Sequence, residues 1–551
     1  MKNYRKDFWN IANTRYLICM AITALIAYGF AAFNPTFSVD DLQVDYYIGS
    51  EKAMLAAGRF TMTLLGVLFN YIKCLPVSAS SIDLLATVAF VWAAVNYCIL
   101  LRRICGDRFT DSVAVLFSCT LISYPLIIEI WEYTAANLCV TMGYLLVSFA
   151  LLMMQSFLHG SKDWRFPAGA AVLLMFVCAS YESLVVVYIF AVFAVLMLQV
   201  IFGSGDEKKV KTILLQGICY AAVLFAGLIL KVLVHKLILF AGNMEPVANG
   251  ARTILWPLLG FKEGMQTVLV GILSQVVLKG IIYFPITELL VACAVLLVIG
   301  VVLCKKYGAS VLLPWFGCYL SLFVLPLLQA YEPMYRTCQV YGMFVAFTLA
   351  LVGMALEKCR FSRIRAIAFF LAGFLVLHQA MYVNYFLTLN HYRSEAENRI
   401  VEDIGDDLQD NFPADKPVIF MGSPLTLKSD IINDQIMEAA SIPERSLRWR
   451  AYRKITWYLA YALDSYTLEL DAENRKLPDT LINSVISFGI YSVHQKAMQD
   501  LFSFNGYDYV RADTDALIDE TAEYVTRNNI PAYPQEGYIV DVGEYLIVHI
   551  P

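Results

Sequence analysis

The sequence has few charged residues for its length. Only 16% of its 551 residues are Asp, Glu, Lys or Arg, against 59% hydrophobic residues and a mean hydropathy of +0.61. Soluble domains carry about 25% charged residues, so this deficit excludes a soluble globular protein. The Lys and Arg residues form no stretch that resembles a nucleic-acid-binding surface, and we expect no nucleic-acid partner.

Metal-binding and disulfide patterns are also missing. The 13 cysteines are scattered, none follows Cys359, and no CxxC or Cys/His ligand spacing occurs. We therefore interpret the cysteines as small apolar residues in helices, and expect neither a disulfide framework nor a zinc site. No internal repeat stands out, and no cofactor is implied.

Apolar runs of about 20 residues recur along the chain, and this is the length that crosses a bilayer as a helix. The first run ends near Phe33, and we interpret it as an uncleaved anchor rather than a signal peptide. Later runs lie at 82–101, 110–128, 135–157, 167–180, 183–203, 211–233, 284–304, 310–329, 337–356 and 366–388. With about eleven spans, the chain is predicted to be an all-α polytopic membrane protein that lies in a lipid bilayer.

Basic residues between the spans predict the orientation, because cytoplasmic loops are enriched in Lys and Arg. They gather in alternate loops, at Arg102, Arg103, Arg108, Lys162, Arg165, Lys208, Lys209, Lys211, Lys305, Lys306, Lys358, Arg360, Arg363 and Arg365. The N-terminus is therefore predicted to be cytoplasmic and loop 34–81 to be outside. This parity requires that Phe60–Pro76 does not cross, and we interpret that stretch as a juxtamembrane helix.

The composition changes at about Leu389. Residues 1–389 form the predicted membrane domain, whose long outer loop, 236–283, is apolar enough to contain half-buried helices. Residues 390–551 alternate between helical and strand periods and predict a soluble extracytoplasmic α/β domain. Its helices are expected at about 394–410, 449–463 and 515–527, and its strands at 417–421, 507–511, 538–542 and 545–550.

Carboxylates recur where spans meet the predicted outer face. The first outer loop has Asp40 and Asp41, with Asp45 one helical turn later. The second has Glu129 and Glu132, and a short break between two apolar runs has Glu182. These residues either mark the ends of spans, where ionised groups stay hydrated, or form an acidic site at the interface.

Basic residues on the same predicted face, together with these carboxylates, match what one type of reaction requires. Transfer of a sugar from a polyprenyl phosphate needs a base for the acceptor hydroxyl and a cation for the departing phosphate. A first-loop Asp suits the first role, and Arg336 suits the second through bidentate phosphate contacts. Arg59 and Lys231 are further candidates for the phosphate, although Lys231 can equally extend to the lipid headgroups.

Aromatic residues at the span ends have two interpretations. Trp131 and Tyr335 can stack on a sugar or an acceptor, or they belong to the aromatic belt of the bilayer. The second reading is typical of membrane proteins in general, and both remain open. Asp40, Asp41 and Asp45 also offer the oxygen ligands that a divalent cation prefers, although no metal site is otherwise evident.

The layout resembles the type II O-antigen glucosyltransferases (the Gtr type II family), part of the GT-C class of polyprenol-dependent membrane glycosyltransferases. The resemblance lies in an N-terminal span, Asp40-Asp41, then Gly58-Arg59-Phe60, and an ending that runs Ile530-Pro-Ala-Tyr-Pro-Gln-Glu-Gly-Tyr538. Phe60 stands where the family leads us to expect tryptophan.

This resemblance implies an undecaprenyl-phosphate-linked hexose donor, most simply glucose, used on the outer face of the bacterial cytoplasmic membrane. The acceptor would be an extracytoplasmic glycan such as O-antigen or a cell-wall polymer. The catalytic carboxylate of the class maps onto Asp40 or Asp41, and Glu129 or Glu132 would fill its second acidic site. Inversion is expected, so a β-linked donor would give an α-linked product.

Two other classes remain as alternatives. A transporter or flippase of a lipid-linked or polar solute would show related halves and helices interrupted near the midplane, and the break at Tyr181–Glu182 is its one supporting feature. A glycan polymerase or ligase also uses polyprenyl carriers, but it would need large external loops, and this chain has a terminal domain instead.

Overall fold

A computed structural model of the chain describes residues 4–11, 14–34, 36, 51–72, 79–131, 133–203, 205, 209–246, 254–330, 334–422, 446–463, 465, 468, 495–512 and 515–550. Within these ranges, nine helices are long and apolar enough to cross a membrane. Three shorter apolar helices accompany them, Arg165–Cys178, Ala309–Leu322 and Val340–Leu356. The chain is thus an all-α polytopic membrane protein with a small C-terminal α/β region, as predicted.

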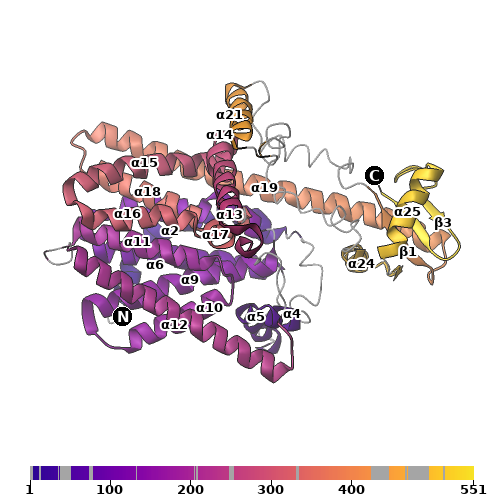
Figure 1. Cartoon of the computed structure of the whole chain (residues 1–551), viewed down its shortest axis with the longest axis horizontal. Coiled ribbons are helices and arrows are strands. Elements are labelled where there is room, and N and C mark those ends of the chain that lie inside the picture. Colours follow the sequence, from indigo (N-terminus) through magenta and orange to yellow (C-terminus); the bar gives the residue numbers. More distant parts are fainter. Residues whose placement is uncertain are drawn as a thin grey trace.

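The main body is a bundle of helices that run side by side (Figure 1). Each predicted apolar run lies in one of them. They are α2 (Thr14–Phe33), α6 (Ala79–Cys105), α7 (Asp111–Ser123), α9 (Thr134–Ser156), α10 (Arg165–Cys178), α11 (Leu184–Phe202), α12 (Val210–Gly242), α15 (Phe284–Tyr307), α16 (Ala309–Leu322), α18 (Val340–Leu356) and α19 (Ser362–Asn411). A continuous apolar core joins them, while many Leu, Ile, Val and Phe side chains remain exposed on the outside, as lipid-facing helices require.

One long apolar segment does not follow the bundle direction. Residues Trp256–Ile282 are long enough for a span, but α13 (Trp256–Ile272), η7 (Leu273–Leu278) and α14 (Lys279–Ile282) run across the bundle in Figure 1. This segment corresponds to the half-buried helices expected in the long outer loop. Helix α21 (Leu447–Leu463) packs beside α14 through Trp449 and Tyr452.

Short elements connect the bundle helices. Near the N-terminus lie α1 (Tyr4–Ile11), α4 (Glu51–Ala56) and α5 (Phe60–Ile72), the last at the place of the predicted juxtamembrane helix. The remaining connections are η2 (Gly106–Arg108), η3 (Pro125–Ile127), α8 (Ile128–Trp131), η4 (Phe157–Ser161), α17 (Val324–Gln329) and η8 (Tyr335–Thr337).

The predicted cytoplasmic loops meet at one end of the bundle. Arg103 forms an ion pair with Asp7 of α1 at 2.7 Å, and Arg102 forms one with Asp111 of α7 at 2.5 Å. At the start of α7, the Thr110 hydroxyl donates a hydrogen bond to Glu357, which follows α18. The connection that carries Arg102 and Arg103 therefore lies beside α1 and beside the segment that follows α18.

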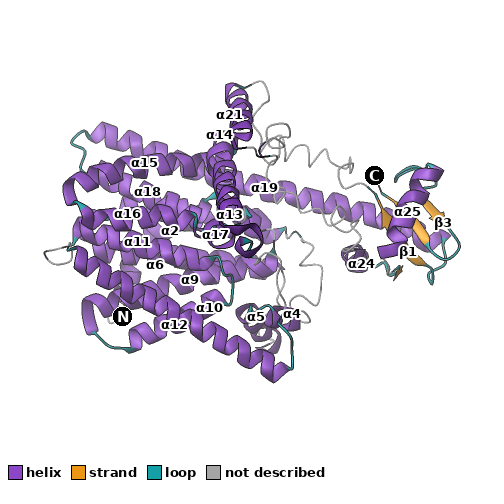
Figure 2. Cartoon of the chain, viewed as in Figure 1, coloured by secondary structure: helices purple, strands orange, loops and turns teal. Residues whose placement is uncertain are grey.

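The C-terminal region is a four-stranded sheet with the order β2-β1-β4-β3 (Figure 2). Strand β1 is parallel to β2 and β4, and β3 is antiparallel to β4. The strands are β1 (Pro417–Met421), β2 (Val510–Arg511), β3 (Ile539–Asp541) and β4 (Leu546–His549), with helices α24 (Gln495–Phe504) and α25 (Asp515–Asn528). The four strands and α25 lie where the alternating periods predict them, whereas α24 was not predicted from the sequence.

Helix α19 joins the membrane bundle to this sheet without a break, although the composition changes at Leu389. Three tyrosines of the sheet region donate hydrogen bonds to aspartates on its outer half: Tyr533 to Asp403, Tyr538 to Asp407 and Tyr507 to Asp406. The hydrogen bond to Asp406 raises the pKa of Tyr507 to about 12. The helix is therefore fastened to the domain through its acidic face.

Candidate active site

Four of the predicted site residues lie outside the described residues. They are the first-loop aspartates Asp40, Asp41 and Asp45, and Glu132 of the second outer loop. Their assignment as the base and the acidic site stays a prediction. The site is therefore built from the predicted charged residues that the structure does describe, Arg59, Glu129, Glu182 and Arg336, which come from four separate connections of the chain.

These connections converge on Tyr181, in the turn between α10 and α11. Its phenol is within electrostatic range of four predicted site residues, which are Arg336, Arg59, Glu182 and Glu129. They are far apart in the sequence, and only folding brings them together. Two cations and two carboxylates are thus within electrostatic range of one ring at the end of the bundle away from the Asp7–Arg103 pair, and Arg59 contacts that ring directly.

Arg336 is held in place by Tyr133, at the start of α9. Its Nη1 donates a hydrogen bond of 2.7 Å to the Tyr133 hydroxyl, and its guanidinium carbon lies 5.3 Å from the centre of that ring. Its backbone carbonyl accepts a hydrogen bond from Gln339. The Gln339 Oε1 accepts one from Ser183, which ties η8 to the turn that carries Glu182.

The Gly58-Arg59-Phe60 motif has a structural explanation. Gly58 adopts φ +74°, and a Cβ there would lie 3.0 Å from Lys231 Nζ and 3.1 Å from the His235 ring. Such a conformation and such a close approach both favour glycine. Phe60 is buried and packs against Phe176, at a ring distance of 6.3 Å.

Between these two residues, Arg59 turns toward the centre of the site. Its guanidinium carbon lies 5.5 Å from the centre of the Tyr181 ring, and its Nε is buried with no hydrogen-bond partner in the described part of the chain. Its Nε is therefore a hydrogen-bond donor that the described residues leave unused.

Lys231 approaches the site from α12. It shares the electrostatic environment of Cys178 with Glu182, so both lie at the same corner. His235, one turn further along α12, is within hydrogen-bond distance of the Ala56 carbonyl, at 3.2 Å. These contacts place Lys231 beside the Gly58 turn and not out among the lipid headgroups alone.

The two aromatic candidates are both buried. Trp131 stacks on Tyr28 with ring centres 3.9 Å apart and an interplanar angle of 16°. The Tyr335 hydroxyl donates to the Gln275 carbonyl of η7 at 3.0 Å, and Lys279 lies 5.6 Å from its ring centre. Their contact with a sugar stays a prediction: the Tyr28 ring covers one face of Trp131, and a backbone carbonyl accepts from the Tyr335 hydroxyl.

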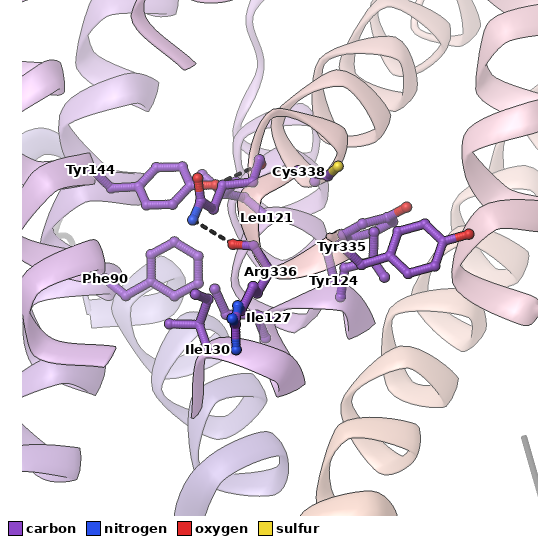
Figure 3. A pocket seen from close by; sticks show the side chains of 12 residues that line it. Phe90, Leu121, Tyr124, Ile127, Ile130, Tyr144, Tyr335, Arg336 and Cys338 are labelled. Atoms are coloured by element: carbon purple, nitrogen blue, oxygen red, sulfur yellow. Dashed lines mark hydrogen bonds between the residues drawn. The ribbon is translucent and has the colours of Figure 1, made fainter. Parts of the chain in front are cut away.

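A small cavity lies behind Arg336 (Figure 3). Its volume of about 20 Å³ has room for roughly one water molecule and not for a hexose. Its lining is mainly apolar, and its polar members are Tyr124, Tyr144, Tyr335, Arg336 and Gln339. This cavity is therefore too small to hold the sugar of a substrate beside Arg336.

Several buried polar residues near this end were not predicted. Asp83, near the start of α6, accepts a hydrogen bond from Asn137 of α9. Further along, Gln379 of α19 donates to Glu288 of α15 at 2.8 Å and accepts from Ser123 of α7 at 3.0 Å. A carboxylate inside an apolar run is the sequence signal that points to both Asp83 and Glu288.

The described residues do not test whether the first-loop aspartates bind a metal ion. Among the residues that the structure describes, no three His, Cys, Asp or Glu side chains gather closely enough to hold a metal ion. Asp40, Asp41 and Asp45 fall outside that set.

Comparison with known proteins places the chain in a family. A family model described as Glucosyl transferase GtrII matches residues 29–354, which is more than half of the chain and includes Arg59, Glu129, Glu182 and Arg336. No curated protein and no solved structure matches it. The matched range begins in α2 and ends in α18, so it covers most of the bundle and all four connections around Tyr181. This chain is therefore a member of the GtrII glucosyl transferase family, a multi-pass membrane glucosyltransferase.

Proposed function

We propose that the protein transfers glucose from a polyprenyl-phosphate donor, as undecaprenyl phosphate carries it, to an extracytoplasmic glycan such as O-antigen or a cell-wall polymer. The observation that supports this most is the convergence of Arg336 and Arg59 with Glu182 and Glu129 at one end of the bundle. An apolar carrier tail lies among spans, and its phosphate then reaches cations at the interface. In this proposal the protein is a GT-C enzyme of the bacterial cytoplasmic membrane, with a cytoplasmic N-terminus and the C-terminal domain outside.

The proposed reaction is a single displacement with inversion. The acceptor hydroxyl oxygen attacks the anomeric carbon, and the bond from that carbon to the phosphate oxygen breaks. The phosphate leaves with the bonding electrons, and the hydroxyl proton passes to Asp40 or Asp41. Arg336 and Arg59 stabilise the charge that develops on the leaving phosphate, with Lys231 beside them.

Glu129 and Glu182 have a different place in this proposal. Together with Glu132 they are proposed as the second acidic site, and their electrostatic range to Tyr181, which Arg336 and Arg59 share, supports this. Trp131, Tyr335 and Asp45 remain candidates for sugar or acceptor contacts. The reaction needs no organic cofactor, and a chelator tests whether a divalent cation assists the first-loop aspartates.

Transport is a weaker alternative. Its supporting feature was the break at Tyr181–Glu182, and this break is the turn that joins α10 to α11. It lies beside Arg336 at the end of the bundle, not within a single helix that is interrupted near the midplane.

Purified protein in nanodiscs, supplied with radiolabelled polyprenyl-phosphate glucose and candidate glycans, tests the proposal. Asp40→Asn and Asp41→Asn are compared at equal expression, with Arg363→Gln, an exposed residue at the other end of the bundle, as the control. We expect at least one Asp variant to lose glucosyl transfer, and we expect the Arg363→Gln control to transfer glucose at the parent rate. If both Asp variants transfer glucose at the parent rate, the assignment of the base is wrong.

A further inference from the structure

Arg393 stands apart from the other basic residues of the chain. It lies on the outer half of α19, and only 4% of its surface is exposed. Its Nε and Nη1 have no hydrogen-bond partner in the part of the chain that the structure describes. A buried guanidinium with unused donors costs several kcal/mol, so such an arrangement requires a compensating anion.

The surroundings of Arg393 support this reading. Asn390, one turn earlier on the same face, is 3% exposed; its Oδ1 is an acceptor without a partner among the described residues, and its NH2 group is the part that can donate to an anion. Glu397 lies one turn later on this face, but it does not hydrogen-bond to the Arg393 Nε or Nη1. The protein's own carboxylate therefore does not satisfy these donors.

The position of Arg393 relates it to the proposed active site. His391 contacts Phe30 near the end of α2, with ring centres 5.5 Å apart, so this turn of α19 lies where the chain enters the acidic first loop. Helix α19 also packs against α8, which in turn packs against η8. Helix α8, which carries Glu129 and Trp131, thus contacts both the helix that carries Arg393 and the segment that carries Arg336.

We propose that Arg393 and Asn390 form a second oxyanion subsite, which binds the phosphate or pyrophosphate of a polyprenyl carrier lipid. This inference rests on the proposed function, because that function brings such lipids to this end of the bundle. Arginine suits it because its charge persists in an apolar environment and its donors match phosphate oxygens. The Asn390 amide supplies a neutral donor beside it.

Two substrates then have separate anchors. The donor phosphate meets Arg336 and Arg59, and Arg393 holds either the spent carrier or a pyrophosphate-linked acceptor on the other side of α8. Both sources share one chemistry, and the probes below distinguish them.

The test uses the full-length protein and the variants Arg393→Met, Arg393→Lys and Arg399→Gln. Arg399 is exposed on the same helix and serves as the matched control. Binding of undecaprenyl phosphate, undecaprenyl pyrophosphate and inorganic phosphate is measured by native mass spectrometry and by the shift in thermal midpoint. No acceptor and no turnover are needed, so failure of glucosyl transfer does not affect the result.

We expect Arg393→Met to lose about tenfold or more in affinity for one of the lipid phosphates, with Arg399→Gln unchanged. Arg393→Lys keeps the charge and retains part of the binding. A ligand-free Arg393→Met protein should be as stable as the parent or more so, because no partner is lost when a buried charge is replaced by an apolar side chain. That stability readout separates a binding role from a structural one.

The opposite results overturn the inference. If Arg393→Met binds all three probes as the parent does, or gains the same thermal shift from them, no subsite exists there. If only inorganic phosphate binding changes, the site does not recognise a carrier lipid. If ligand-free Arg393→Met is clearly less stable while Arg393→Lys is not, the side chain has a structural partner.

Discussion

Gly58→Ala is the substitution that tests most directly how the site is built. The new methyl group would lie 3.0 Å from Lys231 Nζ and 3.1 Å from His235, and the backbone at φ +74° would carry a Cβ that strains it. The left-handed conformation costs roughly 1–2 kcal/mol for a residue with a side chain. The crowding also moves Lys231 and the neighbouring Arg59, which lies 5.5 Å from the Tyr181 ring centre.

We therefore expect Gly58→Ala to lower the free energy of unfolding by about 2 kcal/mol. Glucosyl transfer should fall about tenfold, because a misplaced cation loses about 1.4 kcal/mol of transition-state stabilisation. The assay combines thermal unfolding in nanodiscs with initial rates of transfer from polyprenyl-phosphate glucose.

Gly106→Ala is the matched control. Gly106 has a similar φ of +61°, but no atom lies within 4 Å of a Cβ built there, and it belongs to the connection at the other end of the bundle. It should lose only the backbone contribution and keep the parent rate. Equal rates for Gly58→Ala and Gly106→Ala at saturating and at low donor would refute the role of the Gly58 turn in positioning Arg59 and Lys231.

Three further predictions concern other contacts. Tyr133→Phe removes the hydroxyl that accepts a hydrogen bond from Arg336 at 2.7 Å but keeps the ring contact. A hydrogen bond to a charged group is worth about 1.5–3 kcal/mol, so the KM for the sugar donor should rise about tenfold. Gln379→Leu leaves Glu288 without its donor at 2.8 Å, and thermal unfolding should show a loss of about 1–3 kcal/mol, which Gln379→Leu combined with Glu288→Leu largely recovers. The pKa of Tyr507 is raised to about 12 in the folded protein by its contact with Asp406. This contact therefore stabilises the fold below about pH 10, and the stabilisation is lost as the pH rises through 12. Tyrosinate absorbance and near-UV circular dichroism measure this transition.

Each of these three predictions would be contradicted by a specific result. An unchanged donor KM in Tyr133→Phe would show that Arg336 does not depend on that hydroxyl. A Gln379→Leu protein as stable as the parent would remove the structural role of the Glu288 network. Tyr507→Phe is the control for the pH effect, and an identical alkaline transition in that variant would contradict the assignment to Tyr507.

The architecture followed from the sequence to a large extent. Strand Pro417–Met421 and helix Asp515–Asn528 occur where period and turn residues indicate them. Span ends were less accurate: α12 continues to Gly242, past the predicted end at 233, because an apolar helix can extend beyond a bilayer boundary when its outer turns pack on α4. The segment Trp256–Ile282 has the composition of a span, yet it runs across the bundle.

The site was predicted only in part, and the reason is physical. Charged groups stay hydrated at a bilayer surface, so carboxylates such as Glu129 and Glu182 occur in the sequence as interruptions between apolar runs. Their partners are not visible in this way, because proximity depends on how helices pack.

Composition and period by themselves determined that this chain is a helical membrane protein with a C-terminal α/β region, since each run's transfer into lipid depends on local hydrophobicity alone. Only the tertiary structure decided that Arg59 and Arg336 meet at Tyr181, and that Arg393 is buried with unused donors. These facts depend on contacts between residues far apart in the chain, and no local pattern encodes them.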